Sequence, residues 1–352
     1  MNAEPVIGWD LGGAHLKAAR LGGSGAVERV LQIPCPLWQG MHHLDAALER
    51  AAAELGRASV HAVTMTGEMV DLFGDRREGV ARLVTAMREH VSTAALWLYA
   101  GADGFLEADR AGTAAGRIAS ANWMASASLV AARVPAALLV DIGSTTTDLV
   151  LVEGGCVRAR GRDDGERLAA GELLYTGVVR TPVMALVPHV PFGGEWVPLM
   201  AECFATTADV HRLGGRLPDG ADQHPAADGG EKTIPGSARR LARMIGRDLD
   251  SAPPGAWRAL ADWLARAQTR AIGDAADRLL SRGLLADDAP MVGAGIGRFV
   301  AAELARGRDR PYLDFGSLVS GSDPERVRAS DCAPAVAVAW LAQRARPGQR
   351  PV

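Results

Sequence analysis

The feature that most constrains the fold is residues 138–153, where two apolar segments flank a polar turn. The first apolar segment predicts a buried strand that ends at Asp141, and Gly143 allows a sharp turn after it. The hydroxyls and amides of the turn converge on one point, and such a concavity binds anionic oxygens. The turn residues are Gly143, Ser144, Thr145 and Thr146. A surface hairpin rich in Ser and Thr is the alternative that this stretch alone leaves open.

The carboxylate at the end of this strand predicts a metal ion. Asp141 cannot bond a bare phosphate at neutral pH, because both groups are negatively charged. It can instead hold a hydrated magnesium ion that bridges to the phosphates. Asp148, on the following strand, is expected to face the same cleft. We therefore expect Mg²⁺ as a cofactor.

Residues 6–19 repeat this pattern near the N-terminus. When the aspartates are aligned, the first hairpin matches the second at four positions: Asp10 with Asp141, Gly12 with Gly143, Gly13 with Ser144, and Lys17 with Asp148. The copies lie roughly a domain's length apart, which predicts two related subdomains whose loops hold one phosphate chain from opposite sides. Ala14 and His15 replace the hydroxyl residues of the second loop, so the first loop must depend on backbone amides and Lys17.

The paired pattern resembles the actin, Hsp70 and sugar-kinase superfamily, in which these loops are the two phosphate motifs. The resemblance implies an α/β fold of two RNase H-like subdomains around a central cleft. We expect the first domain at residues 1–135 and the second at 136–332. A C-terminal helix within 333–352 is expected to pack back on the first domain.

Composition agrees with an enzyme of this size. A chain of 352 residues that is 48% hydrophobic can bury two cores. A formal net charge of −3 offers no field for nucleic acid or an anionic membrane. The N-terminus has no basic leader pattern and no apolar run reaches the ~18 residues of a membrane span, so we expect a cytoplasmic protein. A homodimer is an assembly that the sequence leaves open.

A late glycine-rich turn can be interpreted in two ways. Gly293, Ala294 and Gly295 follow a short apolar strand, and a Rossmann dinucleotide site is excluded because its third glycine would fall on Arg298. In the superfamily a glycine pair at this point is the adenosine motif, which makes ATP a second possible ligand. The alternative is a turn that only floors the cleft, in which case Gly295→Val would be much milder than loss of Asp141.

Candidate residues for chemistry also follow other predicted elements. Thr66 and Glu68 come after a strand at 60–65, and either Glu68 or Asp71 is a candidate general base. Capping of a helix by Thr66 is the alternative. Asn122, in a predicted small-residue helix at 117–130, is a candidate to contact substrate or simply to pack.

The second half of the chain adds two substrate candidates and an insertion. Arg180 could bind a carboxylate or diphosphate or form a structural ion pair, and Thr207 belongs to a polar cluster with Asp209. Residues 214–237 are predicted to be a surface insertion that orders with ligand. The arginines from 239 to 247 then form either a solvated basic face or a lid over an anionic substrate.

Several phrases narrow the resemblance: VIGWDLGGAHLKAA, VTMTGEMVDLF, SANWMASA, LLVDIGSTTTDLV, GELLYTGVVRTPV, ECFATTADV and ARRLARMIGRD. Together they are similar to the hydantoinase/oxoprolinase-related proteins linked to tetrahydromethanopterin one-carbon metabolism, which in methanogens include the ether-forming synthase of methanofuran biosynthesis. There the phenol of glutamyl-tyramine displaces diphosphate from an aminomethyl-furan-methyl diphosphate. The resemblance thus implies a transferase of a furan-methyl group to tyramine or glutamyl-tyramine, with release of diphosphate.

The same resemblance implies the residue roles. Asp10 and Asp141 would hold magnesium, the two loops with Lys17 would bind diphosphate, and Glu68 or Asp148 would accept the phenol proton. Two rival functions remain open. One is an ATP-dependent kinase or an oxoprolinase-like ATP hydrolase, and the other is a non-enzymatic nucleotide switch.

Overall fold

The computed structural model describes residues 4–91 and 94–345. Contacts divide the chain into two compact units. Unit 1 is formed by Met1–Leu139, Val150–Arg158 and Leu313–Val352, and unit 2 by Val140–Leu149 and Ala159–Tyr312. The boundary passes through the strands of the second aspartate hairpin, whereas the sequence predicted domain boundaries at 135/136 and 332/333. That division into domains stays a prediction.

Unit 1 contains a six-stranded sheet in the order β3-β2-β1-β4-β5-β6. Its strands are β1 (Val6–Leu11), β2 (His15–Leu21), β3 (Val27–Pro34), β4 (Val60–Met65), β5 (Ala95–Tyr99) and β6 (Phe105–Glu107). The first three strands are antiparallel, and β1, β4 and β5 run parallel. The carboxyl ends of β1 and β4 therefore lie at the same edge of the sheet, with Asp10 next to Thr64.

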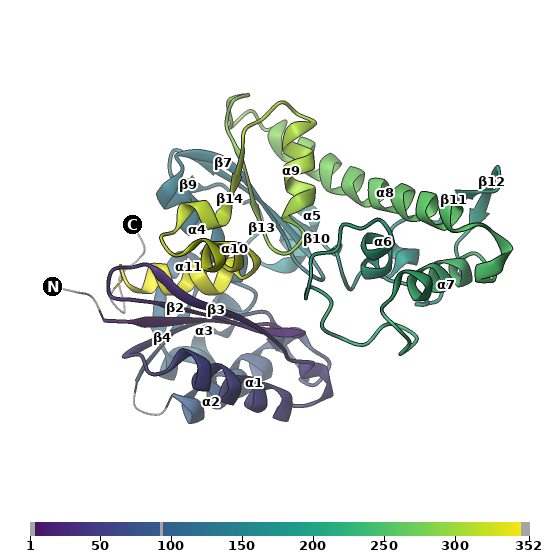
Figure 1. Ribbon diagram of the computed structural model, residues 1–352. Helices are drawn as coiled ribbons and strands as arrows, with labels where there is room; N and C mark the ends of the chain where they lie inside the picture. Colours follow the sequence, from purple (N-terminus) through teal and green to yellow (C-terminus); the bar gives the residue numbers. More distant parts are fainter. Residues whose placement is uncertain (1–3, 92–93, 346–352) are drawn as a thin grey trace. The chain divides into compact units, whose positions relative to one another are not determined.

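Helices cover both faces of this sheet (Figure 1). They are α1 (His42–Leu55), α2 (Arg76–His90), α3 (Ala111–Ile118), α4 (Asn122–Arg133), α10 (Asp323–Asp331) and α11 (Ala333–Ala342). α1 buries residues at helical spacing, from Leu44 to Leu55, against the sheet. α11 is buried along its whole length and packs against β1 and α4. The expected C-terminal helix within 333–352 thus ends at Ala342, and residues 346–352 lie outside the described residues.

The predicted single helix at 117–130 is wrong. The chain forms α3 and α4 instead, and they are separated at residues 119–121. Ser120 has a φ of 51°, in the left-handed region that interrupts a right-handed helix. The alanine-rich sequence gives no helix-breaking signal there, because neither Gly nor Pro is present.

The second sheet follows the order β10-β8-β7-β13-β14, with β9 paired to β8. Its strands are β7 (Ala136–Ile142), β8 (Thr147–Glu153), β9 (Cys156–Val157), β10 (Leu173–Leu174), β13 (Met291–Ala294) and β14 (Tyr312–Asp314). This order matches β3-β2-β1-β4-β5 position by position, so the two aspartate hairpins occupy equivalent places. The predicted repeat of an RNase H-like sheet, and with it the α/β fold of the actin, Hsp70 and sugar-kinase superfamily, is confirmed.

Unit 2 also carries a helical part built around α8 (Figure 1). The helices of unit 2 are α5 (Asp164–Ala170), α6 (Thr207–Leu213), α7 (Ile234–Met244), α8 (Pro254–Leu280) and α9 (Arg298–Arg306). The strands β11 (His189–Phe192) and β12 (Glu195–Pro198) pair with each other. Trp257, Leu260 and Leu264 of α8 lie in a core shared with α6 and α7. Short 3-10 turns occur at Leu37–Gln39, Gly67–Met69, Gly101–Asp103, Ala108–Arg110, Val183–Ala185, Leu249–Ser251 and Phe315–Leu318.

Candidate functional site

The loop between β7 and β8, residues 143–146, is called loop two. Asp141 is half-buried near the end of β7, and the Gly143 amide donates to the Thr146 carbonyl at 2.9 Å. Within residues 4–91 and 94–345, the amides of Ser144, Thr145 and Thr146 have no hydrogen-bond partner. A run of unbonded amides beside three hydroxyls is a concavity of the kind that binds phosphate oxygens.

A distant segment packs against the back of loop two. The amides of Val178, Val179 and Arg180 donate to carbonyls of Gly143 and Ser144 at 3.1, 3.2 and 2.8 Å. A Cβ atom on Gly177 would lie 2.4 Å from the Thr145 nitrogen, so only glycine permits this approach. The carbonyls of Gly143, Ser144 and Thr146 are thereby engaged by protein, which leaves the loop amides available to a ligand.

The glycine turn after β13 lies directly on the end of β7. Gly295 has a φ of 77°, and a Cβ there would lie 2.2 Å from the Ile142 carbonyl oxygen and 2.6 Å from Asp141 Oδ1. At Gly293 a Cβ would lie 2.5 Å from the Tyr312 hydroxyl. Any side chain at this position strikes the strand that carries Asp141, which argues against the expectation that Gly295→Val would be much milder than loss of Asp141.

Asp148 forms an ion pair that the sequence did not reveal. Its Oδ1 lies 2.7 Å from Nη1 of Arg167, a side chain that is 1% exposed. Arg167 also donates to the Glu172 carbonyl at 2.9 Å. The carboxylate of Asp148 is therefore already balanced by a buried guanidinium within unit 2.

The loop between β1 and β2, residues 12–14, is called loop one. Asp10 is 2% exposed near the end of β1, directly across from Lys17 on β2. The Lys17 ammonium lies 3.6 Å from Asp10 Oδ2. The carbonyls of Gly13 and Ala14 accept from the amides of Leu37 and Cys35 at 3.1 and 2.9 Å. His15, which the sequence assigned to the loop, is the buried first residue of β2.

The segment after β4 lies against loop one. The Thr66 amide donates to the Leu11 carbonyl at 3.0 Å, and a Cβ at Gly67 would lie 3.3 Å from the Gly12 carbonyl carbon. Thr66 precedes the short turn Gly67–Met69 but its side chain makes no capping bond. The capping alternative is thus confirmed in position, with Thr66 as the N-cap residue and Glu68 in the first turn, but not in its side-chain bond.

Glu68 is 1% exposed and accepts a hydrogen bond from the Ser120 hydroxyl at 2.9 Å. Sequence analysis missed Ser120, which lies 52 residues away along the chain. Its left-handed backbone aims the hydroxyl at Glu68 and is the type of strained conformation that clusters at functional sites. Asp71, the alternative base, is exposed.

The three remaining substrate candidates have mixed environments. Asn122 begins α4 and its side chain accepts from the Trp123 amide at 2.8 Å. Arg180 is half-buried, and burial lowers its pKa. Thr207 is fully buried and donates to the Gly177 carbonyl at 2.8 Å, which is a supporting contact. A contact between substrate and any of the three stays a prediction.

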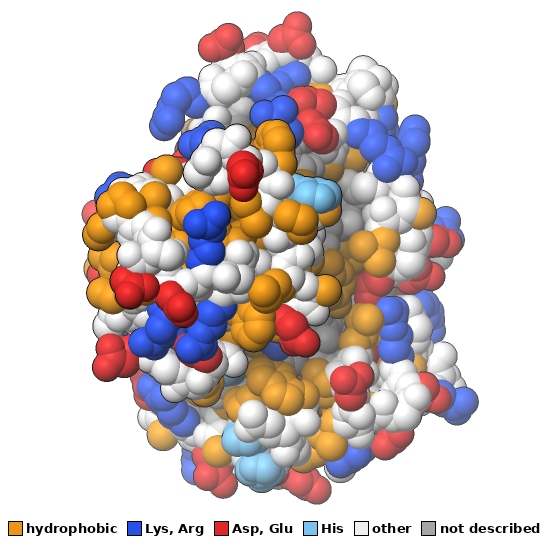
Figure 2. Space-filling view, turned by 90° about the vertical axis from the view of Figure 1, so that its right-hand side faces the viewer, with side chains coloured by type: hydrophobic (Ala, Val, Ile, Leu, Met, Phe, Trp, Pro, Cys, Tyr) orange, Lys and Arg blue, Asp and Glu red, His pale blue; other side chains and the backbone are white. Residues whose placement is uncertain are grey.

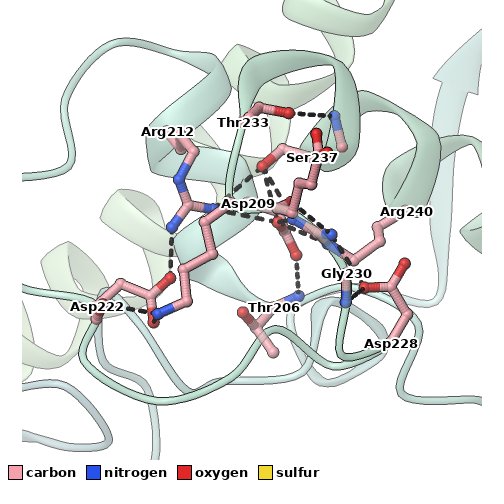
Figure 3. Close-up of polar contacts among 12 residues, drawn as sticks. Thr206, Asp209, Arg212, Asp222, Asp228, Gly230, Thr233, Ser237 and Arg240 are labelled. Carbon is pink, nitrogen blue, oxygen red and sulfur yellow. Dashed lines mark hydrogen bonds and ion pairs between the residues drawn. The ribbon is translucent and has the colours of Figure 1, made fainter.

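The predicted insertion is held by ion pairs (Figure 3). Asp222 pairs with Arg212 and with Lys232, and Asp228 lies 3.0 Å from Arg240 Nη1. Arg240 is 0% exposed, so neither a solvated basic face nor a lid describes it, whereas Arg239, Arg243 and Arg247 are exposed as a solvated basic face requires. The helical spacing of the arginines predicted a surface, but Arg240 faces inward.

Two observations concern partners. No helix within the described residues is long and apolar enough to cross a membrane. On the face displayed in Figure 2, basic and acidic side chains are interspersed with hydrophobic ones.

Comparisons with known proteins add the family. Residues 59–341 match the family model described as hydantoinase/oxoprolinase. A relative from Methanocaldococcus jannaschii is 28% identical over 246 residues, covering 70% of this chain and 72% of that protein. A relative from Methanococcus vannielii is 32% identical over 113 residues, covering 32% of this chain and 50% of that protein. Both are named as the synthase of a gamma-glutamylaminoethyl-phenoxymethyl-furanyl methanamine.

Solved structures support the fold alone. A nucleotide-free acetone carboxylase gives a TM-score of 0.54 at 8% identity, over 85% of this chain and 66% of that chain. A ROK family glucokinase from Streptomyces griseus gives a TM-score of 0.48 at 16% identity, over 97% of this chain and 100% of that chain.

Proposed function

This chain belongs to the hydantoinase/oxoprolinase family, and on that premise we propose that it is a transferase that forms an aryl-alkyl ether. The phenol of tyramine or glutamyl-tyramine would displace diphosphate from an aminomethyl-furan-methyl diphosphate. The names of the two curated relatives support the ether product. The observation that carries the proposal for this chain is loop two, whose unbonded amides lie beside Asp141.

The reaction needs charge stabilisation more than a strong nucleophile. As the carbon–oxygen bond to diphosphate breaks, its electron pair leaves with the diphosphate, and the furan stabilises the positive charge left on the methylene carbon. Amide donors aimed at the departing oxygens stabilise that developing charge. The phenol oxygen then forms the new bond to the methylene carbon and its proton passes to a base.

The residues present are compatible with magnesium. Within the described residues no group of three or more His, Cys, Asp or Glu side chains is arranged to hold a metal ion. A hydrated Mg²⁺ needs only one or two carboxylates when phosphate oxygens complete its shell. Asp141, half-buried near the end of β7, and Asp10, buried near the end of β1, would each offer one carboxylate. When bound, the ion would supply positive charge to the diphosphate oxygens.

For the general base we propose Glu68 rather than Asp148. Protonation of Asp148 would weaken its ion pair with the buried Arg167 guanidinium, which is costly. Glu68 follows Gly67 in the segment against loop one and accepts a hydrogen bond from the uncharged hydroxyl of Ser120. The phenol proton would therefore pass to a Glu68 carboxylate oxygen.

An ATP-dependent enzyme is the second candidate, since an acetone carboxylase shares the fold. The sequence feature that favoured ATP was the glycine pair. In the structure Gly295 gives room to Ile142 and Asp141, and Gly293 gives room to Tyr312. Protein contacts thus account for both glycines without an adenine base, which supports the diphosphate hypothesis over ATP and over a nucleotide switch.

The test is an assay of purified protein with an aminomethyl-furan-methyl diphosphate and tyramine or glutamyl-tyramine, with Mg²⁺, in the presence and absence of ATP. We expect ether and inorganic diphosphate in equal amounts without ATP. Heat-inactivated protein and a reaction without the phenol are the controls. Strict ATP dependence would replace this function with the second candidate.

A further inference from the structure

A buried side-chain amide lies behind loop two. Gln268 of α8 is 1% exposed, and its Nε2 donates to the Gly177 carbonyl and to the Thr176 hydroxyl, both at 2.8 Å. The hydroxyl of Thr147, at the start of β8, donates to the Thr176 carbonyl at 2.6 Å. Gln268 thus connects the long helix to the segment that packs against loop two.

A buried histidine fixes the orientation of this amide. Burial lowers the pKa of His211 to about 4, so the imidazole is neutral at pH 7. Its Nε2 lies 2.8 Å from Gln268 Oε1, and Arg216 approaches the other ring nitrogen at 3.5 Å. Because Oε1 can only accept, Nε2 carries the proton, and the amide nitrogen must point at Gly177.

The Gly177 carbonyl receives further donors from α6 and its own segment. The Thr207 hydroxyl donates at 2.8 Å and the Thr181 hydroxyl at 3.3 Å. On its other side Gly177 touches the backbone of Ser144 and Thr145 without room for a side chain. The donors therefore fix the distance between this segment and loop two.

The helix that carries Thr207 is itself fixed (Figure 3). Asp209 is 2% exposed and accepts from the Thr206 amide at 3.1 Å, from the Ser237 hydroxyl at 2.8 Å and from Arg240 Nη2 at 2.7 Å. These contacts join α6 to α7. The Thr207 hydroxyl is thereby held in place by the fold rather than by a ligand.

We propose that Gln268 and Thr207 are positioning residues for loop two. They hold Gly177 so that the amides of Val178, Val179 and Arg180 engage the loop carbonyls and leave the loop amides for the leaving group. The inference rests on the proposed function, in which loop two holds the diphosphate. Both side chains are buried and bonded to protein, as a positioning role requires.

The first test is amide hydrogen exchange in the full-length protein, followed by mass spectrometry of a peptide that covers residues 174–183. In Gln268→Met and Thr207→Val we expect the amides of Val178, Val179 and Arg180 to exchange at least ~10-fold faster, since the donors that hold Gly177 are lost. Thr207→Ser keeps the hydroxyl and should restore the wild-type rate. The matched control is Tyr99→Phe, which removes a buried hydroxyl bonded to Ser128 in unit 1.

Unchanged exchange in both variants would overturn the positioning role, and so would an equal increase in Tyr99→Phe. If Thr207→Val does not fold, Gln268→Met decides the question. A second measurement, calorimetry with magnesium diphosphate, should show binding weakened about 10-fold in Gln268→Met and unchanged in Tyr99→Phe. If the wild type binds no diphosphate, the proposed function fails, while the exchange result still decides whether Gln268 positions the loop.

Discussion

The two aspartate hairpins begin from one sequence pattern and are supported in different ways. In loop one a Cβ at Gly12 would lie 2.8 Å from the His15 carbonyl oxygen, and a Cβ at Gly13 would lie 2.8 Å from a Val70 methyl group. In loop two the equivalent Gly143 has ordinary space, with its nearest contact at 3.6 Å. Around loop two the crowded positions are instead Gly177 and Gly295, which lie in the segments that support the loop.

The two hairpins also differ in the partners that balance their charged side chains. Asp10 faces a cation on the neighbouring strand of its own hairpin, Lys17. At the matching place Asp148 is an anion, and its partner Arg167 comes from a different element. Loop one thus balances charge within the hairpin, whereas loop two depends on distant segments for both charge and shape. If both hairpins hold the diphosphate as proposed, we expect a cation from the first hairpin and amide donors from the second.

The largest effect is expected at the two aspartates. Asp141→Asn should lower turnover on the order of 10³-fold, the upper range for loss of a preorganised charge-stabilising group, with little change in thermal midpoint because Asp141 is half-buried. Asp10→Asn should lower turnover as far but also cost about 1–3 kcal/mol of unfolding free energy, because it removes the partner of Lys17. Steady-state kinetics and urea unfolding measure both. Normal turnover in both variants would contradict the shared role of the hairpins.

A buried histidine lies behind each hairpin, and both should titrate alike. His61 accepts from the Trp9 indole at 3.0 Å in unit 1, and burial lowers the pKa values of His61 and His211 to about 4. Unfolded histidine titrates near pH 6.5, so the unfolded chain binds more protons between pH 6.5 and 4. As the pH falls from 6.5 to 4, the unfolding free energy should decrease by up to ~3 kcal/mol per histidine. Above pH 7 the two histidines should contribute no pH dependence.

Urea unfolding of wild type, His61→Gln and His211→Gln between pH 4 and 8 measures this dependence. In each variant the decrease in unfolding free energy between pH 6.5 and 4 should be about half of that in the wild type. A wild-type curve without any decline below pH 6.5 would show that the two imidazoles are not buried in neutral form.

Lys17 tests the cationic contribution of loop one. Lys17→Met should lower turnover by ~10²-fold, because one preorganised donor to the developing charge is lost. Lys17→Arg is the matched control and should retain most activity, since it keeps the charge opposite Asp10. Inorganic diphosphate should inhibit the wild type competitively. Equal turnover in Lys17→Met and wild type would remove the lysine from the mechanism.

The smallest effect concerns the glycines. Gly177→Ala should cost about 2 kcal/mol of unfolding free energy, because its Cβ would lie 2.4 Å from the loop backbone. Gly143→Ala, with space for a Cβ, should change stability by under ~0.5 kcal/mol. If loop two approaches the diphosphate closely, the same Ala should still weaken diphosphate binding, measured by calorimetry. A Gly143→Ala variant less stable than Gly177→Ala would contradict the close support of loop two by Gly177.

The sequence by itself determined the hairpins, their repetition and the fold that follows from it. Asp10 and Asp141 are at or near strand ends as predicted, because a short apolar run followed by a polar turn is a local signal. It also placed Thr66 and Glu68 after the strand next to β1. Periodicity failed where backbone geometry was the deciding factor, since the break at Ser120 lies in a sequence that favours a continuous helix.

Only the tertiary structure decided which partner each polar group has. Gln268 lies 91 residues from Gly177, Ser120 lies 52 from Glu68, and Arg240 lies 31 from Asp209. The local sequence around a glutamine on an amphipathic helix, or around an arginine in a basic run, does not indicate that the side chain makes a buried contact. Such contacts depend on which faces of distant elements meet once the core has formed. The physical reason is that propensity and hydrophobic periodicity are local properties, whereas satisfaction of a buried polar group depends on distant segments that the fold brings together.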